Sequence, residues 1–279
     1  MDANMLYSIL LELVVRHTAA IPVTMGHLAQ ALFLNLVKQF DPVLSMRLHN
    51  EPAYRPYTIS PLSGGTRVGE RFRLHPGQRC HLRITLLDGG ALWQALQRHY
   101  LEAGPIGMRL GDVDLQLTRM LSTPHTDPAG RAGSNDWQTL VTLPAQHTIT
   151  MYFTSPTAFS MSERQFALFP QPPLIWESLL RVWNRYAPAH MYMGKQGICE
   201  ALRSQVVVTA CELNTALLHF PTSVQKGFMG WCTYKLSTDE SLAARLTTLA
   251  AFAHYAGIGY KTTMGMGQAH SHFGGLPSG

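Results

Sequence analysis

The sequence predicts an α+β protein, and three observations lead to that class. Apolar residues follow helical spacing in some segments and β-branched, strand-like runs in others through residues 1–120. A segment rich in Gly, Pro, Ser and Asp, 121–136, then interrupts the pattern. Helical and strand-like segments alternate again over 137–279. We therefore expect an N-terminal domain, a linker or surface insertion, and a C-terminal domain with these three ranges.

The N-terminal range gives a βαββαβ order. The apolar positions Leu28, Leu32 and Leu36 have helical spacing, and Pro42 suits the first position of a second, short helix. This order is the ferredoxin-like pattern. The expected elements are a strand at 7–16, helices at 26–40 and 41–48, a strand at 57–60, one or two strands within 71–87, a helix at 91–102 and a strand at 108–119.

The C-terminal range again mixes the two element types, although it shows no convincing internal repeat of the first. A second copy of the same fold is compatible with this order. Asp239 or Ser241 can cap the last helix. The expected elements are strands at 137–143 and 148–153, a helix at 174–186, strands at 205–213 and 228–236, a helix at 242–255 and a final strand at 264–271.

Composition limits the classes of function. The 279 residues carry a net charge of +5, with 14% charged residues, so the basic excess matters only where it is clustered. No C-x-x-C pair, signal peptide or membrane-length apolar run is present, so we expect no zinc site and a cytoplasmic protein with reduced thiols. We expect no cofactor and no metal. The four cysteines are Cys80, Cys199, Cys211 and Cys232.

A glycine-rich stretch near the C-terminus is the main candidate binding site. Two Gly-x-Gly pairs flank a segment that carries Lys261, and glycine permits a positive φ and exposed N–H groups that bind anions. A helix C-cap followed by a hairpin turn explains the pattern equally well. A dinucleotide fingerprint does not fit, because a helix precedes the stretch. The residues proposed to hold a phosphate backbone are Gly257, Gly259, Lys261, Thr262, Gly265 and Gly267.

His49 is the main candidate for catalysis, in a predicted loop with Tyr54 and Arg55. Cleavage of RNA without a metal needs a base, an acid and a cation, and histidine and arginine suit these roles. With thirteen histidines in the chain, spacing alone does not distinguish His49 from an ordinary exposed loop residue.

Arginines gather in one segment before the predicted 91–102 helix. Arg71, Arg73, Arg79 and Arg83 are odd-numbered, so strand geometry can project several of them from one face toward a phosphate backbone. A solvated strand face is an equally good explanation for each one. We take Arg71, Arg73 and the later Lys226 as RNA-binding candidates.

Four segments together resemble the repeat-processing endoribonucleases of CRISPR systems, the Cas-six family of the RAMP superfamily. The glycine-rich stretch looks like that superfamily's glycine-rich loop. The four segments are 257–267, then 153–159 with 168–170 and the helix ending at Asn184, then 225–230, and finally 31–35 leading through Pro42 to His49.

The resemblance implies two tandem ferredoxin-like, RRM-like RAMP domains. It implies binding of CRISPR repeat RNA and one cut in each repeat of the precursor crRNA. The cut would proceed by attack of the 2′-hydroxyl without a metal, leaving a 2′,3′-cyclic phosphate and a 5′-hydroxyl. His49 lies where the family's catalytic histidine often lies, Arg55 where some members carry a lysine, and Leu34 where some carry a tyrosine. Whether His49 is base or acid stays open.

Two other functions remain. A non-catalytic RAMP subunit of a CRISPR effector complex would share the fold and bind RNA without cutting it. The hypothesis of a nucleotide-binding metabolic enzyme rests only on the glycine-rich stretch. The expected partners are CRISPR repeat RNA and, beyond it, effector complex subunits, for a prokaryotic cytoplasmic protein that is a monomer or homodimer.

Overall fold

Two compact units make up the protein. The computed structural model describes residues 5–50, 55–88, 90–104, 106–162, 165–221 and 223–274. The first unit comprises Met1–Ser134 together with two short segments from the C-terminal half, Leu218–Ser223 and Thr263–Gly265. The second unit comprises Asn135–Leu217, Val224–Thr262 and Met266–Gly279. Residues 121–134 of the predicted insertion thus belong to the first unit, as does the middle of the glycine-rich stretch.

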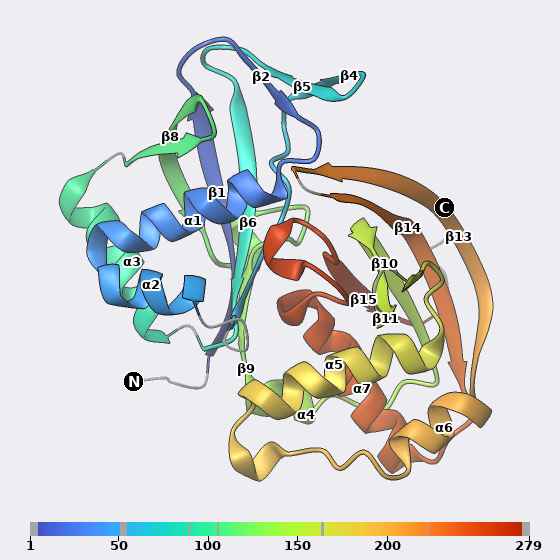
Figure 1. The fold of residues 1–279 in the computed structure, drawn as a ribbon. Coiled ribbons are helices and arrows are strands. Elements are labelled where there is room, and N and C mark those ends of the chain that lie inside the picture. Colours follow the sequence, from blue (N-terminus) through green and yellow to red (C-terminus); the bar gives the residue numbers. More distant parts are fainter. Residues whose placement is uncertain are drawn as a thin grey trace. The chain divides into compact units, whose positions relative to one another are not determined.

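The main sheet of the first unit has the ferredoxin-like strand order. Its neighbouring strands all pair antiparallel, and a further strand, β9 (Gly133–Asp136), pairs with β1. Two helices, α1 (Gly26–Phe40) and α3 (Gly90–Ala103), lie along this sheet in Figure 1. The strands in spatial order are β3 (Tyr57–Ile59), β6 (Arg79–Leu86), β1 (Met5–Val15), β8 (Val113–Leu121) and β7 (Gly107–Leu110).

Alternation along β1 builds the core of this unit. Ile9, Leu11 and Leu13 are fully buried in the same cluster as the apolar side of α1, where Leu32 and Leu36 lie. Side chains two residues apart share one face of a strand, and those four apart share one side of a helix. The same periodicity was visible in the sequence, and the predicted 26–40 helix is confirmed by α1.

The opposite face of β1 is closed by the segment predicted as an insertion. The buried Arg83 donates from Nε to the Ser8 hydroxyl at 2.8 Å and to the Arg131 carbonyl at 3.0 Å. Arg131 in turn makes a bidentate ion pair with the buried Asp127. Burial opposes ionisation of Asp127, but the bonds from Arg131 outweigh it and lower the pKa of that carboxyl. Among the four arginines from which several were expected to project from one face, Arg83 is therefore buried and bonds β6 to β1 and to this segment.

Two segments of the first unit differ from their sequence predictions. The connection expected at 17–24 contains a strand, and the single strand expected at 108–119 is the β7–β8 hairpin, which turns at Gly111 with φ of 60°. Periodicity misses both, because short hairpins contain too few residues to show it. The extra strand joins a separate three-stranded sheet in the order β2 (Ala19–Pro22), β5 (Arg71–Leu74) and β4 (Thr66–Val68).

The second unit repeats the strand order of the first. Its sheet runs β13 (Val206–Phe220), β14 (Ser223–Leu236), β10 (Thr148–Thr157) and β15 (Ala269–Phe273). Taken along the chain, these strands and two long helices again give βαββαβ, so the predicted pair of ferredoxin-like folds is confirmed. None of the described helices has the length and apolarity to cross a bilayer. The remaining elements are α5 (Pro172–Tyr186), α6 (Ile198–Ser204), α7 (Glu240–Ala256), the β11 (Phe159–Ser162) and β12 (Gln165–Ala167) hairpin, and single 3₁₀ turns at Pro124–Thr126, Ala189–Met191 and Thr262–Met264.

The strand expected at 137–143 is instead the short helix α4 (Trp137–Val141). The Asp136 side chain caps it by accepting the Thr139 N–H at 2.7 Å. Trp137 packs edge-on against Trp183, with ring centroids 5.0 Å apart, and both are fully buried. Burial of this aromatic pair and the cap outweigh the β-branched composition of the segment.

The cap of α7 provides a test of local stability. Asp239 is the N-cap, since its side chain accepts the Leu242 N–H at 2.9 Å, whereas Ser241 lies inside the first turn and is exposed. Asp239→Ala should lower the free energy of unfolding by about 1 kcal/mol, because one helix N–H loses its partner. Ser241→Ala is the matched control and should change it little. Urea unfolding measures both, and equal losses would contradict the assignment.

Candidate functional site

Helix α2 (Pro42–Asn50) positions the candidate catalytic histidine. Asp41 starts this helix by accepting the Leu44 N–H at 2.8 Å through Oδ1. The Ser45 hydroxyl then donates to the Leu34 carbonyl at 2.8 Å, which ties α2 to α1. Ser45 and Leu48 are both buried on the side of α2 that faces the core. The helix is therefore fixed along both its start and its middle.

His49 lies in the last turn of α2, so the predicted loop position is wrong. Because Ser45 and Leu48 point inward, the helical rotation of about 100° per residue turns His49 outward, and its side chain is exposed. Across the part of the chain that the structure describes, the imidazole has no hydrogen bond or ion pair. Both ring nitrogens are thus available to a bound substrate.

The other two catalytic candidates follow α2 in the chain. Tyr54 lies outside the described residues. Arg55 is half-buried just before β3, near enough to Tyr57 for its charge to act on that phenol. Burial raises the pKa of Tyr57, while the hydrogen bond from Gln30 and the Arg55 charge oppose the rise.

Gln30 connects this region to the glycine-rich stretch within the first unit. Its Nε2 lies 3.1 Å from the Tyr57 hydroxyl and 3.3 Å from the Thr263 hydroxyl, and donates toward both. Sequence reasoning did not single out Gln30. The sequence signal that could have found Gln30 is a carboxamide side chain in the first turns of a helix whose other inward positions are apolar.

The glycine-rich stretch begins as a helix cap. α7 ends at Ala256, and Gly257 is its C-cap with φ of 63°. Gly259, Gly265 and Gly267 also have positive φ, at 85°, 84° and 69°. The C-cap interpretation is therefore confirmed. The phosphate-binding interpretation of the same residues stays a prediction, and the two are compatible.

Close backbone packing explains why these positions are glycines. A Cβ on Gly267 would lie 2.1 Å from the Ile258 carbonyl oxygen, inside the second unit. In the first unit, a Cβ on Gly26 at the start of α1 would lie 1.7 Å from the Met264 carbonyl oxygen. Side chains cannot occupy either space. The middle of the stretch is thus pressed onto the first turn of α1.

Lys261 and its neighbours are the accessible part of the stretch. Lys261 is the one non-glycine residue with positive φ in the described chain, at 53°. Its Nζ lies 5.4 Å from the centre of the Tyr260 ring, and Tyr260 is exposed. Burial lowers the pKa of the Lys261 ammonium. A bound anion would favour its charged form again, as expected of a phosphate-binding lysine.

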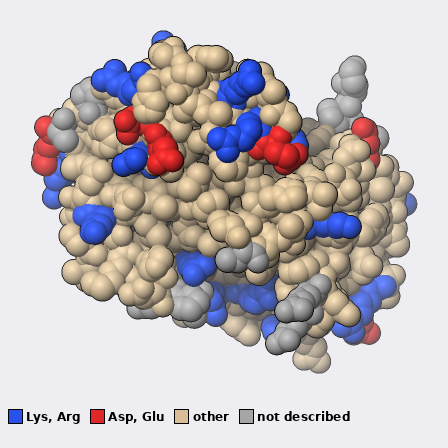
Figure 2. All heavy atoms as spheres, turned by 45° about the horizontal axis from the view of Figure 1, so that its top comes forward, with Lys and Arg blue, Asp and Glu red and all other residues tan. Residues whose placement is uncertain are grey.

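The remaining RNA-binding candidates are exposed. Arg71 and Arg73 share one side of β5, and Lys226 lies on β14. Figure 2 shows Lys and Arg spread over the face it presents, with Asp or Glu beside several of them. The basic excess on that face is therefore distributed, and no single patch identifies the binding surface.

His27 lies in the first turn of α1. It lines a cavity of 580 Å³ with His17 and Arg71, and its buried Nδ1 has no hydrogen-bond partner in the described chain. Burial lowers the pKa of His27, so the neutral imidazole is favoured. Among the described residues, no group of three or more His, Cys, Asp or Glu is arranged to hold a metal ion.

Comparison with known proteins identifies the family. The CRISPR Cas6 N-terminal domain model matches residues 5–140, and the CRISPR-associated endoribonuclease Cas6 model matches residues 151–269. A product complex of Thermus thermophilus Cas6 is 30% identical, with a TM-score of 0.79, over 96% of this chain and all 100% of that one. The chain belongs to the Cas6 family.

The other matches described here have a lower sequence identity to this chain than the product complex, and some cover a smaller part of the matched protein. A second structure of Thermus thermophilus Cas6 is 27% identical, with a TM-score of 0.75, over 98% of this chain and 100% of that one. Streptococcus thermophilus Cas6 is 27% identical over 118 residues, which are 42% of this chain and 48% of that protein. This chain therefore spans about half the length of that curated relative. A RAMP protein that binds different RNA substrates, 12% identical with a TM-score of 0.59, shares the fold alone.

Gly26 provides a test of the contact between α1 and the glycine-rich stretch. In an ordinary helix, Gly→Ala stabilises by about 1 kcal/mol. Gly26→Ala should instead lower the free energy of unfolding by about 1–3 kcal/mol, because the new methyl group overlaps the Met264 carbonyl. Gly107→Ala is the control, since its Cβ would meet nothing within 4 Å. A Gly26→Ala protein as stable as the wild type in urea would refute this contact.

Proposed function

We propose that this Cas6 protein is an endoribonuclease that binds CRISPR repeat RNA and cuts precursor crRNA once in each repeat without a metal ion. The observation that carries the proposal is the exposed His49 at the end of α2, within a chain that matches the Cas6 family along both halves. The match to a Cas6 product complex over its whole length also supports it.

The proposed reaction is an internal transesterification. A base takes the proton from the 2′-hydroxyl at the cut, and the 2′-oxygen forms a bond to the adjacent phosphorus. The bond from phosphorus to the 5′-oxygen breaks, and an acid gives that oxygen a proton. The products carry a 2′,3′-cyclic phosphate and a 5′-hydroxyl, so no water molecule is consumed. Histidine can fill either proton-transfer role near neutral pH.

Each candidate residue has a role that matches its chemistry. His49 transfers a proton, and the Arg55 guanidinium stabilises the negative charge that develops on the phosphoryl oxygens. Tyr54 is a further candidate for contact with the reacting nucleotides. The glycine-rich stretch with Lys261, and the exposed Arg71, Arg73 and Lys226, bind the RNA backbone. The candidate residues therefore divide into those proposed to cut the RNA and those proposed to bind it.

The proposed partner is CRISPR repeat RNA, including the precursor crRNA, and the protein is proposed to act as a monomer or homodimer. Subunits of a CRISPR effector complex are proposed as further partners, which would receive the processed crRNA. Binding of repeat RNA without cutting would instead identify the chain as an RNA-binding RAMP subunit.

His49→Ala should cut the cognate repeat at least about 100-fold more slowly than the wild type, because the proton transfer is lost. The assay is cleavage of end-labelled repeat RNA in EDTA, with product ends mapped, and RNA affinity is measured in parallel and should be retained. His125→Ala is the matched control, since His125 is an exposed histidine in a 3₁₀ turn. Full activity of the His49→Ala variant would show that His49 is not catalytic. Failure of the wild type to cut any cognate repeat would refute the proposed function.

A substrate with sulfur in place of the 5′-oxygen at the cut decides between base and acid. A thiolate leaves without a proton, so this substrate bypasses the acid. If His49 is the acid, the His49→Ala enzyme should cut the sulfur substrate nearly as fast as the wild type does. If His49 is the base, the variant should stay slow on both substrates.

A further inference from the structure

The side chain of Gln30, in the first turns of α1, joins two segments of the first unit that are far apart in the sequence. Its Nε2 lies 3.1 Å from the Tyr57 hydroxyl and 3.3 Å from the Thr263 hydroxyl. Tyr57 begins β3, and Thr263 lies in the short segment Thr263–Gly265 that belongs to the first unit. One carboxamide therefore holds these two segments together.

Both hydroxyls that Gln30 holds are buried. Tyr57 is 1% exposed, and its ring also packs against Phe33 of α1, with ring centroids 4.8 Å apart. Thr263 is 6% exposed. A buried hydroxyl that loses its protein partner has little water to replace that partner, so the loss of either bond is costly. The two bonds therefore constrain both segments.

Each of these hydroxyls lies two residues from a candidate of the proposed reaction. Arg55 precedes Tyr57 by two residues, and Gly265 follows Thr263 by two residues. Two residues of chain span at most about 7 Å, so a displaced hydroxyl would also displace the candidate beside it. Gln30 thus connects the guanidinium proposed to stabilise the phosphoryl charge with a glycine proposed to bind the RNA backbone.

His49 lies near the level of Gln30 along α1. The chain reverses between the two helices, because only Asp41 separates them and the Ser45 hydroxyl donates back to the Leu34 carbonyl. Figure 1 shows α2 beside α1. His49 is four residues beyond Ser45, about 6 Å further along α2, and Gln30 is four residues before Leu34. The first turns of α1 therefore run past the end of α2 that carries His49.

We propose, on the basis of the proposed endoribonuclease function, that Gln30 is a positioning residue for RNA cleavage. It holds the Arg55 segment in a fixed place relative to the middle of the glycine-rich stretch. A carboxamide neither takes nor gives a proton near neutral pH, so Gln30 acts through Tyr57 and Thr263 and is not itself the acid or the base. Because a misplacement of about 1 Å can slow a reaction by about 100-fold, such a connection affects the rate of cutting.

A purely structural role for Gln30 would have a different signature. If Gln30 only stabilised the fold, its replacement would lower the free energy of unfolding and leave the cleavage rate of the folded protein unchanged. Loss of a positioning residue lowers the rate at which bound RNA is cut more than it lowers the affinity for RNA. The test therefore measures the cleavage rate constant with protein in saturating excess. It separately measures the Kd for a repeat with a 2′-deoxynucleotide at the cut, which cannot react.

Gln30→Met keeps the length of the side chain and removes both hydrogen bonds. It should lower the cleavage rate constant about tenfold in EDTA, because the reacting groups are less well placed, and should change the Kd less than about threefold. Urea unfolding checks that the variant is folded under the assay conditions. A wild-type rate constant in Gln30→Met, or a loss that lies entirely in the Kd, overturns the proposal.

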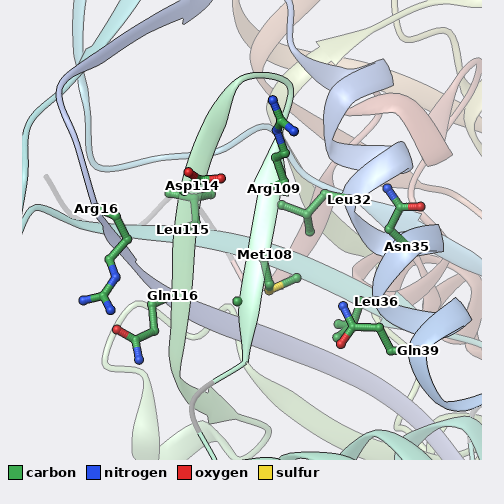
Figure 3. A pocket seen from close by; sticks show the side chains of 11 residues that line it. Arg16, Leu32, Asn35, Leu36, Gln39, Met108, Arg109, Asp114, Leu115 and Gln116 are labelled. Carbon is green, nitrogen blue, oxygen red and sulfur yellow. The ribbon is translucent and has the colours of Figure 1, made fainter.

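Gln39→Met is the matched control on the same helix. Gln39 lies about 14 Å further along α1, where Figure 3 shows it beside a pocket with Asn35 and Leu36. Its carboxamide bonds to the His99 ring at 3.2 Å, so the same substitution also removes a hydrogen bond there. Gln39→Met should cut as the wild type does, and an equal loss in both variants overturns the proposal.

Thr263→Val keeps the test decisive if Gln30→Met fails to fold. Valine has the shape of threonine without the hydroxyl, so this variant breaks only the bond to the glycine-rich stretch. It should lower the cleavage rate constant by about threefold or more. Combined with Gln30→Met, it should cut no more slowly than Gln30→Met alone, since both substitutions remove the same bond. Losses that multiply in the double variant would contradict the connection.

Backbone hydrogen exchange tests the connection without any cleavage. The N–H groups of 263–265 should exchange faster in Gln30→Met than in the wild type or Gln39→Met, because Thr263 has lost its partner. Unchanged exchange would show that Gln30 does not hold this segment. Cleavage of no cognate repeat by the wild type refutes the proposed function, whereas equal cleavage by the wild type and Gln30→Met refutes the positioning role alone.

Discussion

The candidate site depends on a close contact between two backbone segments, which is possible only because one of them has a glycine and therefore no Cβ at that point. The carbonyl of Met264 occupies the space that a side chain on Gly26 would fill, so the middle of the glycine-rich stretch lies directly on the first turn of α1. That contact brings Thr263 within reach of Gln30, which also bonds to the buried Tyr57. The middle of this stretch, which the sequence alone explains equally well as a flexible turn, thereby packs into the first unit.

Helix α1 contacts different parts of the candidate site at different points along its length. Its first turns contact the glycine-rich stretch, and its middle accepts the Ser45 hydroxyl that docks α2. Because α1 is itself buried along Leu32 and Leu36 in the sheet core, these two contacts are held on one rigid element. The helix that carries the proposed cutting residue and the middle of the glycine-rich stretch are thus positioned by the same packing.

Segments with long periodic patterns were predicted correctly. Short segments, and segments whose composition and tertiary contacts favour different structures, were not. The 26–40 helix and the βαββαβ order follow from apolar spacing, which is set by the same burial that stabilises the core. The 137–143 segment has strand-like composition, yet the cap from Asp136 and the packing of Trp137 on Trp183 make it a helix. Such contacts join residues far apart in sequence, so no local pattern reports them.

The sequence by itself determined the family, the type of fold and the kinds of residues that can act on RNA, because these depend on local order, spacing and side-chain chemistry. Only the tertiary structure decided which of those residues are accessible. Arg83 carries the same charge as Arg73, but it is buried and bonded to Ser8 while Arg73 is exposed. His49 faces outward because Ser45 and Leu48 on the same helix face the core. Accessibility depends on what packs against a residue, and that is settled by contacts across the fold.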